Sequence, residues 1–186
     1  KDVNLTLDDI DLIACCIGPG SFTGIRIGIA SIKAIAEVKN LPIVSVTSLE
    51  SLAYNEDSLG AIISMIDARN NQVYAGIFNN KHEKNADYIA DSIDNTIEVI
   101  RKYIENNAIR DITFVGDGST SNKEILEKAF SGVNIVFSDN NKQKGTSLGI
   151  CAYNKFTKKE DIKNADTLNP LYLRKSQAER MKNAGK

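Results

Sequence analysis

The sequence predicts an α/β protein built from two related lobes, and three observations support this fold class. A continuous apolar run at 11–17 ends in Gly-Pro-Gly, which is typical of a strand buried on both faces of a parallel sheet. Two later apolar runs flank an Ala-Arg-Asn-Asn turn and indicate a β-hairpin. The last four expected elements then repeat the strand and helix order of the first four. We therefore expect the remainder of a first lobe at 1–57, a second lobe at 58–160, and a C-terminal tail at 161–186 that packs back on the lobes.

The first lobe is expected to alternate strands and helices. Its apolar runs and helical spacing predict strands at 11–17 and 43–46 and helices at 23–38 and 48–55. Ser48 is the expected N-cap of the second helix, and Ser21 or Thr23 that of the first, because Ser and Thr side chains accept hydrogen bonds from free helical N–H groups. The sequence starts at Lys1 without an initiator methionine and runs at once into a capping pattern at 6–10, so we expect that a segment upstream is missing and that this lobe is incomplete.

The second lobe is expected to begin with the hairpin and to end in alternating strands and helices. Asn residues at the hairpin turn are available for positive φ. The expected strands lie at 61–67, 72–78, 87–90, 111–115 and 133–137, and the expected helices at 95–106, 122–130 and 146–158.

Composition limits the functions that this chain can support. With 186 residues, 42% apolar and 25% charged, it can bury a core, and a net charge of −1 gives no overall field that would attract a polyanion. The longest apolar stretch is too short for a membrane span, and no signal-peptide pattern opens the chain, so we expect a cytoplasmic protein. Cys15, Cys16 and Cys151 form neither a disulfide framework nor a zinc spacing. His82, the single histidine, lies in a charged loop where we expect it to be solvated, and we expect no bound metal.

The loop at 18–24, Gly-Pro-Gly-Ser-Phe-Thr-Gly, has two interpretations. A glycine-rich turn between a strand and a helix can hold a phosphate on its free N–H groups, but this spacing matches neither the dinucleotide fingerprint nor a Walker A loop. The alternative is turn geometry alone. Asp67 and the Gly-Asp-Gly at 116–118 follow strands in a similar way, and Asp67 can equally cap its own turn or pair with Arg69. The residues that could face a nucleotide are Gly18, Gly20, Ser21, Asp67, Gly116 and Gly118.

The helix after this loop is apolar or small over most of its circumference. One face can pack on the sheet, and the rest needs another cover. Gly24 and Gly28 leave a groove where a second backbone can approach, so we expect a contact between subunits; a helix from the upstream segment is the alternative cover. The expected partner interface comprises Gly24, Ile25, Gly28, Ile29, Ile32 and Ala36.

Four ordered motifs resemble those of one known family. They are GPGSFTGIRIG at 18–28, PIVSVTSLE at 42–50, IDARNNQVY at 66–74 and PLYLR at 170–174. The chain is similar over nearly its whole length to the bacterial TsaB (YeaZ) family of tRNA threonylcarbamoyladenosine biosynthesis proteins. The resemblance implies an actin/Hsp70/sugar-kinase-like fold of two ribonuclease H-like lobes. It also implies a role in placing the threonylcarbamoyl group on N6 of the adenosine at position 37 of tRNA.

The same resemblance implies a supporting subunit rather than an enzyme. Expected partners are a TsaD-like catalytic paralogue, bound through the helix after GPGSFTG, and a TsaE-like ATPase. A homodimer is expected in isolation, with tRNA contacted only through the complex and ATP or ADP bound only there. The catalytic paralogue has a His-x-x-x-His metal motif, which a chain with one histidine cannot supply. Two other functions stay open, a glycoprotease-like M22 metallopeptidase and a small-molecule kinase of the same fold class.

Overall fold

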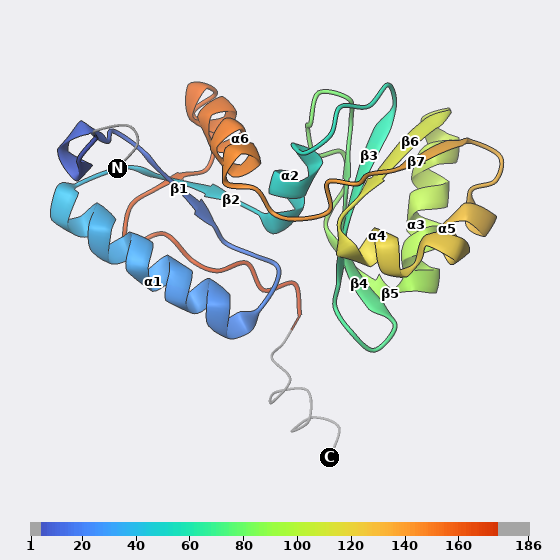
Figure 1. Cartoon of the computed structure of the whole chain (residues 1–186), viewed down its shortest axis with the longest axis horizontal. Coiled ribbons are helices and arrows are strands. Elements are labelled where there is room, and N and C mark those ends of the chain that lie inside the picture. The colour runs from blue at the N-terminus through green and yellow to red at the C-terminus, as the bar shows by residue number, and fades with distance from the viewer. Residues whose placement is uncertain (1–4, 175–186) are drawn as a thin grey trace, which may run out of the picture.

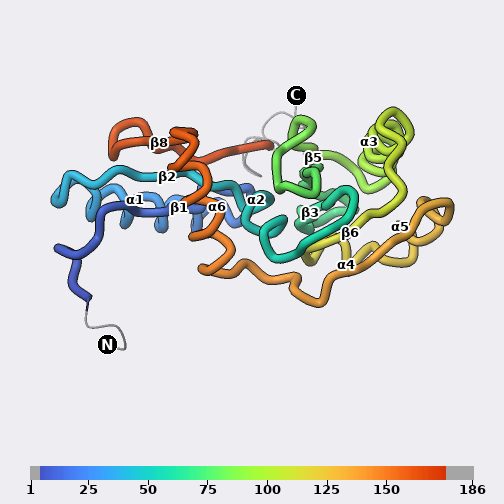
Figure 2. The backbone as a smooth tube through the Cα atoms, turned by 90° about the horizontal axis from the view of Figure 1, so that it is seen from above, coloured from blue at the N-terminus to red at the C-terminus, as the bar shows by residue number. Residues whose placement is uncertain are grey.

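A computed structural model describes residues 5–174 and contains two β-sheets placed at opposite ends of its long axis (Figures 1 and 2). The first sheet has the strand order β1-β2-β8 and the second β5-β4-β3-β6-β7. The strands are β1 Ile13–Cys16, β2 Ile43–Val46, β3 Ala61–Asp67, β4 Gln72–Phe78, β5 Ile89–Ser92, β6 Asp111–Val115, β7 Asn134–Phe137 and β8 Ile162–Lys163. The helices are the 3-10 turn η1 Leu7–Asp9 and α1 Phe22–Lys39, α2 Ser48–Ala53, α3 Ile93–Asn106, α4 Asp117–Ser121, α5 Lys123–Ala129 and α6 Gly145–Thr157.

The first sheet is covered by a helix on each face. Strands β1 and β2 run parallel and are joined by α1, which packs on one face, while α6 packs on the other (Figure 1). Ile43 lies in the core beneath α1 and Val44 in the core beneath α6, so successive β2 side chains enter different cores. This double burial explains why both strands read as continuous apolar runs rather than as alternating ones.

The second sheet contains the hairpin of β3 and β4 and two further strands, β6 and β7, that run parallel to β3. Strand β3 pairs antiparallel with β4 and parallel with β6, and α3 packs on one face. At the hairpin tip Arg69, Asn70 and Asn71 all have positive φ, which confirms the expected use of asparagine there. The opposite face packs on α2, whose Leu49 and Leu52 contact the Ile62 side of β3. Helix α2 therefore lies between the two sheets.

Helix α6 and residues 161–174 of the expected tail lie with the first sheet, and residues 175–186 of that tail lie outside the described residues. The sequence places α6 in the second lobe, whereas the folded chain packs it against β1, β2 and α2. Strand β8, which the sequence did not predict, then pairs with β2, and Leu168 is fully buried in the core beneath α1. A two-residue strand has no periodicity to detect. Figure 1 shows the chain after β8 running along α1 toward its first turn, where the Leu171 N–H donates to the Ile17 carbonyl at 2.8 Å.

The expected elements are present with small differences at their ends, and the structure adds β8 and α4. Thr6 caps the first turn with a full capping box, and Ser21 rather than Thr23 caps α1. Thr47, not Ser48, caps α2, because its hydroxyl accepts the Glu50 N–H at 3.0 Å. The third strand of the second sheet is β5, two residues later than expected, and α3 starts two residues earlier than expected. The single helix expected at 122–130 is preceded by a separate helix, α4, where a loop was expected.

Candidate functional site

The solvent-facing side of α1 is apolar and small along its length. Ile27 is 63% exposed, Val38 83% and Ile35 36%, and they alternate with small residues on one stripe. We call this stripe the outer face of α1; it comprises Gly24, Ile27, Gly28, Ser31, Ile35 and Val38. A monomer rarely leaves so many large aliphatic side chains together in water, so the outer face is a candidate interaction surface.

The inner side of α1 belongs to the core of this chain. Ile29 and Ala36 are buried against β1, β2 and Leu168, while Ile25 and Ile32 are half-buried beside them. The expectation that all six predicted interface residues contact a partner is therefore wrong for Ile29 and Ala36. They lie on the apolar stripe of α1 that faces the sheet, and side chains buried against the sheet are not available to a partner. Gly24 and Gly28 lie on the outer face as expected.

Gly28 is open to a partner rather than required by the fold. A Cβ atom built there would meet no atom within 4 Å, and its φ is not in the left-handed region. The two glycines of the outer face lie one helical turn apart, and both also border the cleft between the two sheets. Because neither carries a side chain, a second helix can approach the backbone of α1 closely there.

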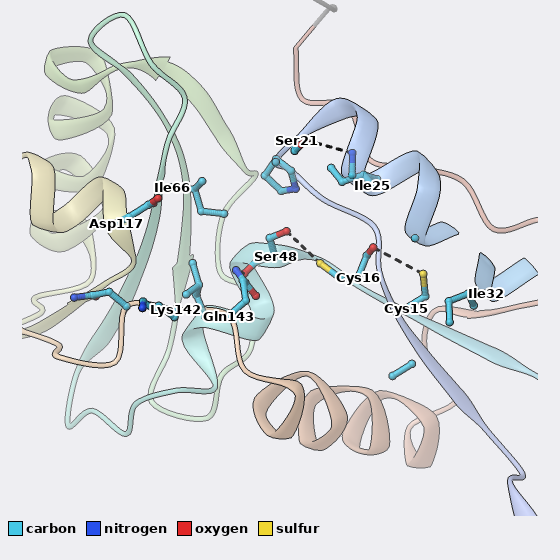
Figure 3. A pocket seen from close by; sticks show the side chains of 17 residues that line it. Cys15, Cys16, Ser21, Ile25, Ile32, Ser48, Ile66, Asp117, Lys142 and Gln143 are labelled. Atoms are coloured by element: carbon cyan, nitrogen blue, oxygen red, sulfur yellow. Dashed lines mark hydrogen bonds between the residues drawn. The ribbon is translucent and has the colours of Figure 1, made fainter. Parts of the chain in front are cut away.

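A cleft of about 690 Å³ lies between the two sheets (Figure 3). One wall comes from the Pro19–Ser21 loop, β1 and α1, and the other from Ile66, Asp117 and the segment before α6. Cys16 Sγ and Ser48 Oγ lie 3.2 Å apart at its base. The labelled lining residues are Cys15, Cys16, Ser21, Ile25, Ile32, Ser48, Ile66, Asp117, Lys142 and Gln143.

Three glycines predicted to face a nucleotide are instead enclosed by protein. A Cβ atom at Gly116 would lie 2.1 Å from the Met65 carbonyl oxygen, and one at Gly118 would lie 2.8 Å from the Ile66 carbonyl carbon. Both glycines are needed because α4 packs directly on the β3 backbone. Gly18 has φ +103° and fits against Ile25. Of the predicted loop residues, Gly20 and Ser21 line the cleft.

Asp67 serves its own turn. Its Oδ1 accepts the Arg69 backbone N–H at 2.7 Å, and its own N–H donates to Asp117 Oδ1 at 3.1 Å. The expected side-chain pairing of Asp67 with Arg69 does not form within 4 Å. The structure thus favours the turn-capping interpretation of Asp67 over a metal-facing or phosphate-facing one.

The described residues do not assemble a nucleophile with a base or a metal ligand set. Among residues 5–174 no group of three or more His, Cys, Asp or Glu side chains is placed to hold a metal ion. Burial raises the pKa of the Cys15 thiol to about 11, so it stays protonated at neutral pH. His82 is not solvated as expected, since its ring stacks on Tyr54 at 4.4 Å and Nε2 lies 2.8 Å from the Glu56 carbonyl oxygen. Through these contacts the loop between β4 and β5 packs against the segment between α2 and β3 that links the two sheets.

The fold and the outer face of α1 define a class: a two-lobed α/β protein that presents an apolar helix on its first lobe. Residues 1–182 match the family model described as TsaD, tRNA N6-adenosine threonylcarbamoyltransferase. The chain therefore belongs to the TsaD family. Its relatives place it with the TsaB (YeaZ) members of that family, as the four motifs predict.

Two curated relatives carry the name tRNA threonylcarbamoyladenosine biosynthesis protein TsaB. The Bacillus subtilis protein is 32% identical over 128 residues, which cover 68% of this chain and 55% of the relative. The Haemophilus influenzae protein is 26% identical over 181 residues, covering 91% of this chain and 72% of the relative. The chain thus spans little more than half the length of the Bacillus subtilis protein.

Solved structures show the same fold. A Pseudomonas aeruginosa protein similar to the peptidase YeaZ superposes with a TM-score of 0.74 and 22% identity, over 93% of this chain and 78% of that protein. YeaZ from the same species gives a TM-score of 0.71. The expected α/β fold of the ribonuclease H-like, actin/Hsp70/sugar-kinase-like class is thereby confirmed. Among residues 5–174 no helix has both the length and the apolarity needed to cross a lipid bilayer.

Proposed function

We propose that this chain is a supporting subunit in the formation of threonylcarbamoyladenosine in tRNA. In this proposal it dimerises with a TsaD-like transferase and works with a TsaE-like ATPase. The observation that carries the proposal is the outer face of α1, where Ile27 and Val38 are largely exposed in a protein whose relatives are named as threonylcarbamoyladenosine biosynthesis proteins. Burying such side chains in an interface contributes about 25 cal/mol of favourable free energy for each Å² of apolar surface removed from water.

A supporting role rather than a catalytic one follows from the residues available. The chain has a single histidine, so it cannot form a paired histidine metal site. That histidine is held between Tyr54 and Glu56, outside the cleft between the sheets. Ser21 and Ser48, the hydroxyl groups in the cleft, have no histidine beside them to act as a base. The proposed subunit therefore contributes binding surface, and the transfer chemistry belongs to the paralogue.

The remaining parts of the proposal concern ligands and location. ATP or ADP binds only in the complex; Gly18, Gly116 and Gly118 are enclosed by protein atoms, and only Gly20 of the candidate glycines lines the cleft. In isolation the chain forms a homodimer through the outer face of α1. The protein acts in the cytoplasm, where the tRNA substrate is found.

The test is a reconstituted transfer assay with single omissions. The complete mixture contains this chain, the TsaD-like and TsaE-like proteins, unmodified tRNA, ATP and threonylcarbamoyl-adenylate. We expect product only when this chain and its paralogue are both present, and none from this chain alone. Transfer by this chain alone, or full transfer without it, would overturn the proposal, and so would proteolysis or sugar phosphorylation by the isolated protein.

A further inference from the structure

A cluster of aromatic rings and a guanidinium group joins the first turn of α1 to the C-terminal segment. The rings of Phe22 and Tyr172 stack with centroids 5.0 Å apart. The Arg26 guanidinium carbon lies 4.0 Å from the Phe22 ring centre, and Arg26 Nε donates to Tyr172 Oη at 2.7 Å. Phe22 is 39% and Tyr172 41% exposed, so both rings still face solvent. The cluster holds an arginine in a fixed position without a carboxylate.

Two surface hollows meet at this cluster. One, of about 480 Å³, is lined by Arg26, Lys33 and Tyr172. The other, of about 410 Å³, is lined by Tyr172 together with Arg69 and Arg174. We call the combined surface the arginine–tyrosine patch; it comprises Phe22, Arg26, Lys33, Arg69, Tyr172 and Arg174.

The cationic side chains of the patch form no close ion pair in the described residues, although Arg174 lies near enough to Asp91 to help lower the pKa of that carboxyl. In the described part of the chain, none of its four cations has a carboxylate oxygen within 4.0 Å. Asp67 also lines the second hollow, but one of its oxygens accepts the Arg69 backbone N–H. The sequence continues with the same charge: residues 174–186 contain five basic residues and one acid, namely Arg174, Lys175, Arg180, Lys182, Lys186 and Glu179.

Partly exposed aromatic rings beside guanidinium groups without a close carboxylate partner in the described residues match the chemistry of single-stranded RNA. Unpaired bases stack on aromatic side chains, and arginines bind the phosphates that follow them. A duplex offers no free base face to Tyr172, so a loop is the better fit. We propose that the arginine–tyrosine patch binds an RNA loop, with a base on Tyr172 and phosphates at Arg26 and Arg174. This inference rests on the proposed function in taking tRNA as the RNA, and it adds a contact by this chain to a tRNA otherwise held through the complex.

The experiment measures binding of an unmodified tRNA transcript to the full chain by fluorescence anisotropy over a range of salt concentrations. Tyr172→Ala is expected to weaken binding about tenfold or more, because stacking contributes about 1–3 kcal/mol for each base. Arg26→Ala and Arg174→Ala are expected to weaken it several-fold and to reduce the salt slope by about 1 each. Tyr172→Phe keeps the ring for stacking but loses the hydrogen bond from Arg26 Nε, so it is expected to bind more weakly than the wild type but better than Tyr172→Ala. Lys128→Ala, an exposed lysine on α5 in the other lobe, is the matched charge control.

The outcomes separate this inference from the proposed function. Thermal melting first shows whether each variant folds. Arg174→Ala is the variant least expected to disturb the fold, because Arg174 lies outside every core cluster. Equal binding by Lys128→Ala, Arg174→Ala and Tyr172→Ala, or no binding by the wild type at about 50 mM salt, would overturn the RNA site. Variant-sensitive tRNA binding combined with failure of the transfer assay would leave the RNA site standing and overturn the proposed function instead.

Discussion

Lys155 of α6 and Glu50 of α2 form a buried ion pair at the joint between the two sheets, with Nζ and Oε1 2.7 Å apart. Their side chains are only 11% and 14% exposed. Asp161, in the turn before β8, lies 2.8 Å from the same ammonium. Glu50 also accepts the Thr47 N–H at the start of α2, so one carboxylate both caps α2 and holds α6.

Removing Lys155 is therefore expected to destabilise the protein strongly. Lys155→Met leaves Glu50 buried without its counter-charge, and we expect the free energy of unfolding to fall by about 3 kcal/mol. Urea denaturation measures this difference. The double variant Lys155→Met with Glu50→Gln removes the orphaned charge and should recover part of the loss. If the single variant were as stable as the wild type, the ion pair would not hold the joint.

The same ion pair predicts that the stability of the protein depends on pH in the alkaline range. Burial alone lowers the pKa of Lys155, but the carboxylates of Glu50 and Asp161 outweigh it and raise the pKa above its ordinary value. A raised pKa in the folded state stabilises the protein fully below the unfolded pKa of about 10.4, and this contribution is lost as pH rises through the folded value. The stability gap between wild type and Lys155→Met should stay constant from neutral pH to about pH 9 and shrink above about pH 10.5. A gap that closed below pH 9 would contradict the ion pair as its source.

The glycine at the start of α4 is expected to be structural. Gly116 has φ +106°, and a Cβ atom there would clash with the Met65 carbonyl. We expect Gly116→Ala to lower the free energy of unfolding by more than about 2 kcal/mol or to prevent folding. Gly132→Ala is the control, since a Cβ atom at Gly132 meets nothing within 4 Å. Chemical denaturation compares the two variants, and equal stability would reopen the interpretation of Gly116 as a ligand-facing glycine.

The three cysteines are expected to differ in reactivity. Burial raises the pKa of Cys15 to about 11 and that of Cys151 to about 12, whereas Cys16 is only half-buried. Only the thiolate reacts, so alkylation at pH 8 should label Cys16 at least about tenfold faster than the other two. Mass spectrometry of the native protein locates the label, and Cys16→Ser should abolish the fast phase. Fast labelling of Cys15 would show that the core beneath α1 opens readily.

Sequence patterns predicted the elements well where burial is regular. The apolar run before the Gly-Pro-Gly loop and the strands of the hairpin have periods that a buried sheet imposes on any sequence. The helix expected at 23–38 ends at Lys39, and Asn40 is its C-cap in the left-handed region. Helix α4 escaped prediction because its residues, Gly-containing and polar, have low helix propensity, and it is held by packing on β3.

The site was predicted less completely because it depends on contacts distant in sequence. Helical spacing located two apolar stripes on α1 but could not tell which one the sheet covers, so Ile29 and Ala36 were assigned to a partner. The arginine–tyrosine patch has no local signal at all, since Arg26 and Tyr172 lie 146 residues apart. The net charge of −1 argues against binding of a polyanion by the chain as a whole. The folded chain nevertheless places Arg26, Lys33, Arg69 and Arg174 on one surface.

The measurement closest to the central claim is sedimentation velocity of Gly28→Leu, alone and mixed with the TsaD-like paralogue. A Cβ atom at Gly28 would meet no atom within 4 Å, so we expect the fold to survive while a partner on the outer face of α1 is displaced. Gly149→Leu makes the same change at an equally open helical glycine, on α6. We predict that Gly28→Leu weakens association at least about tenfold, the loss of about 1.4 kcal/mol, while Gly149→Leu associates like the wild type. Unchanged association of Gly28→Leu, or loss only in Gly149→Leu, would contradict the outer face of α1 as the binding surface.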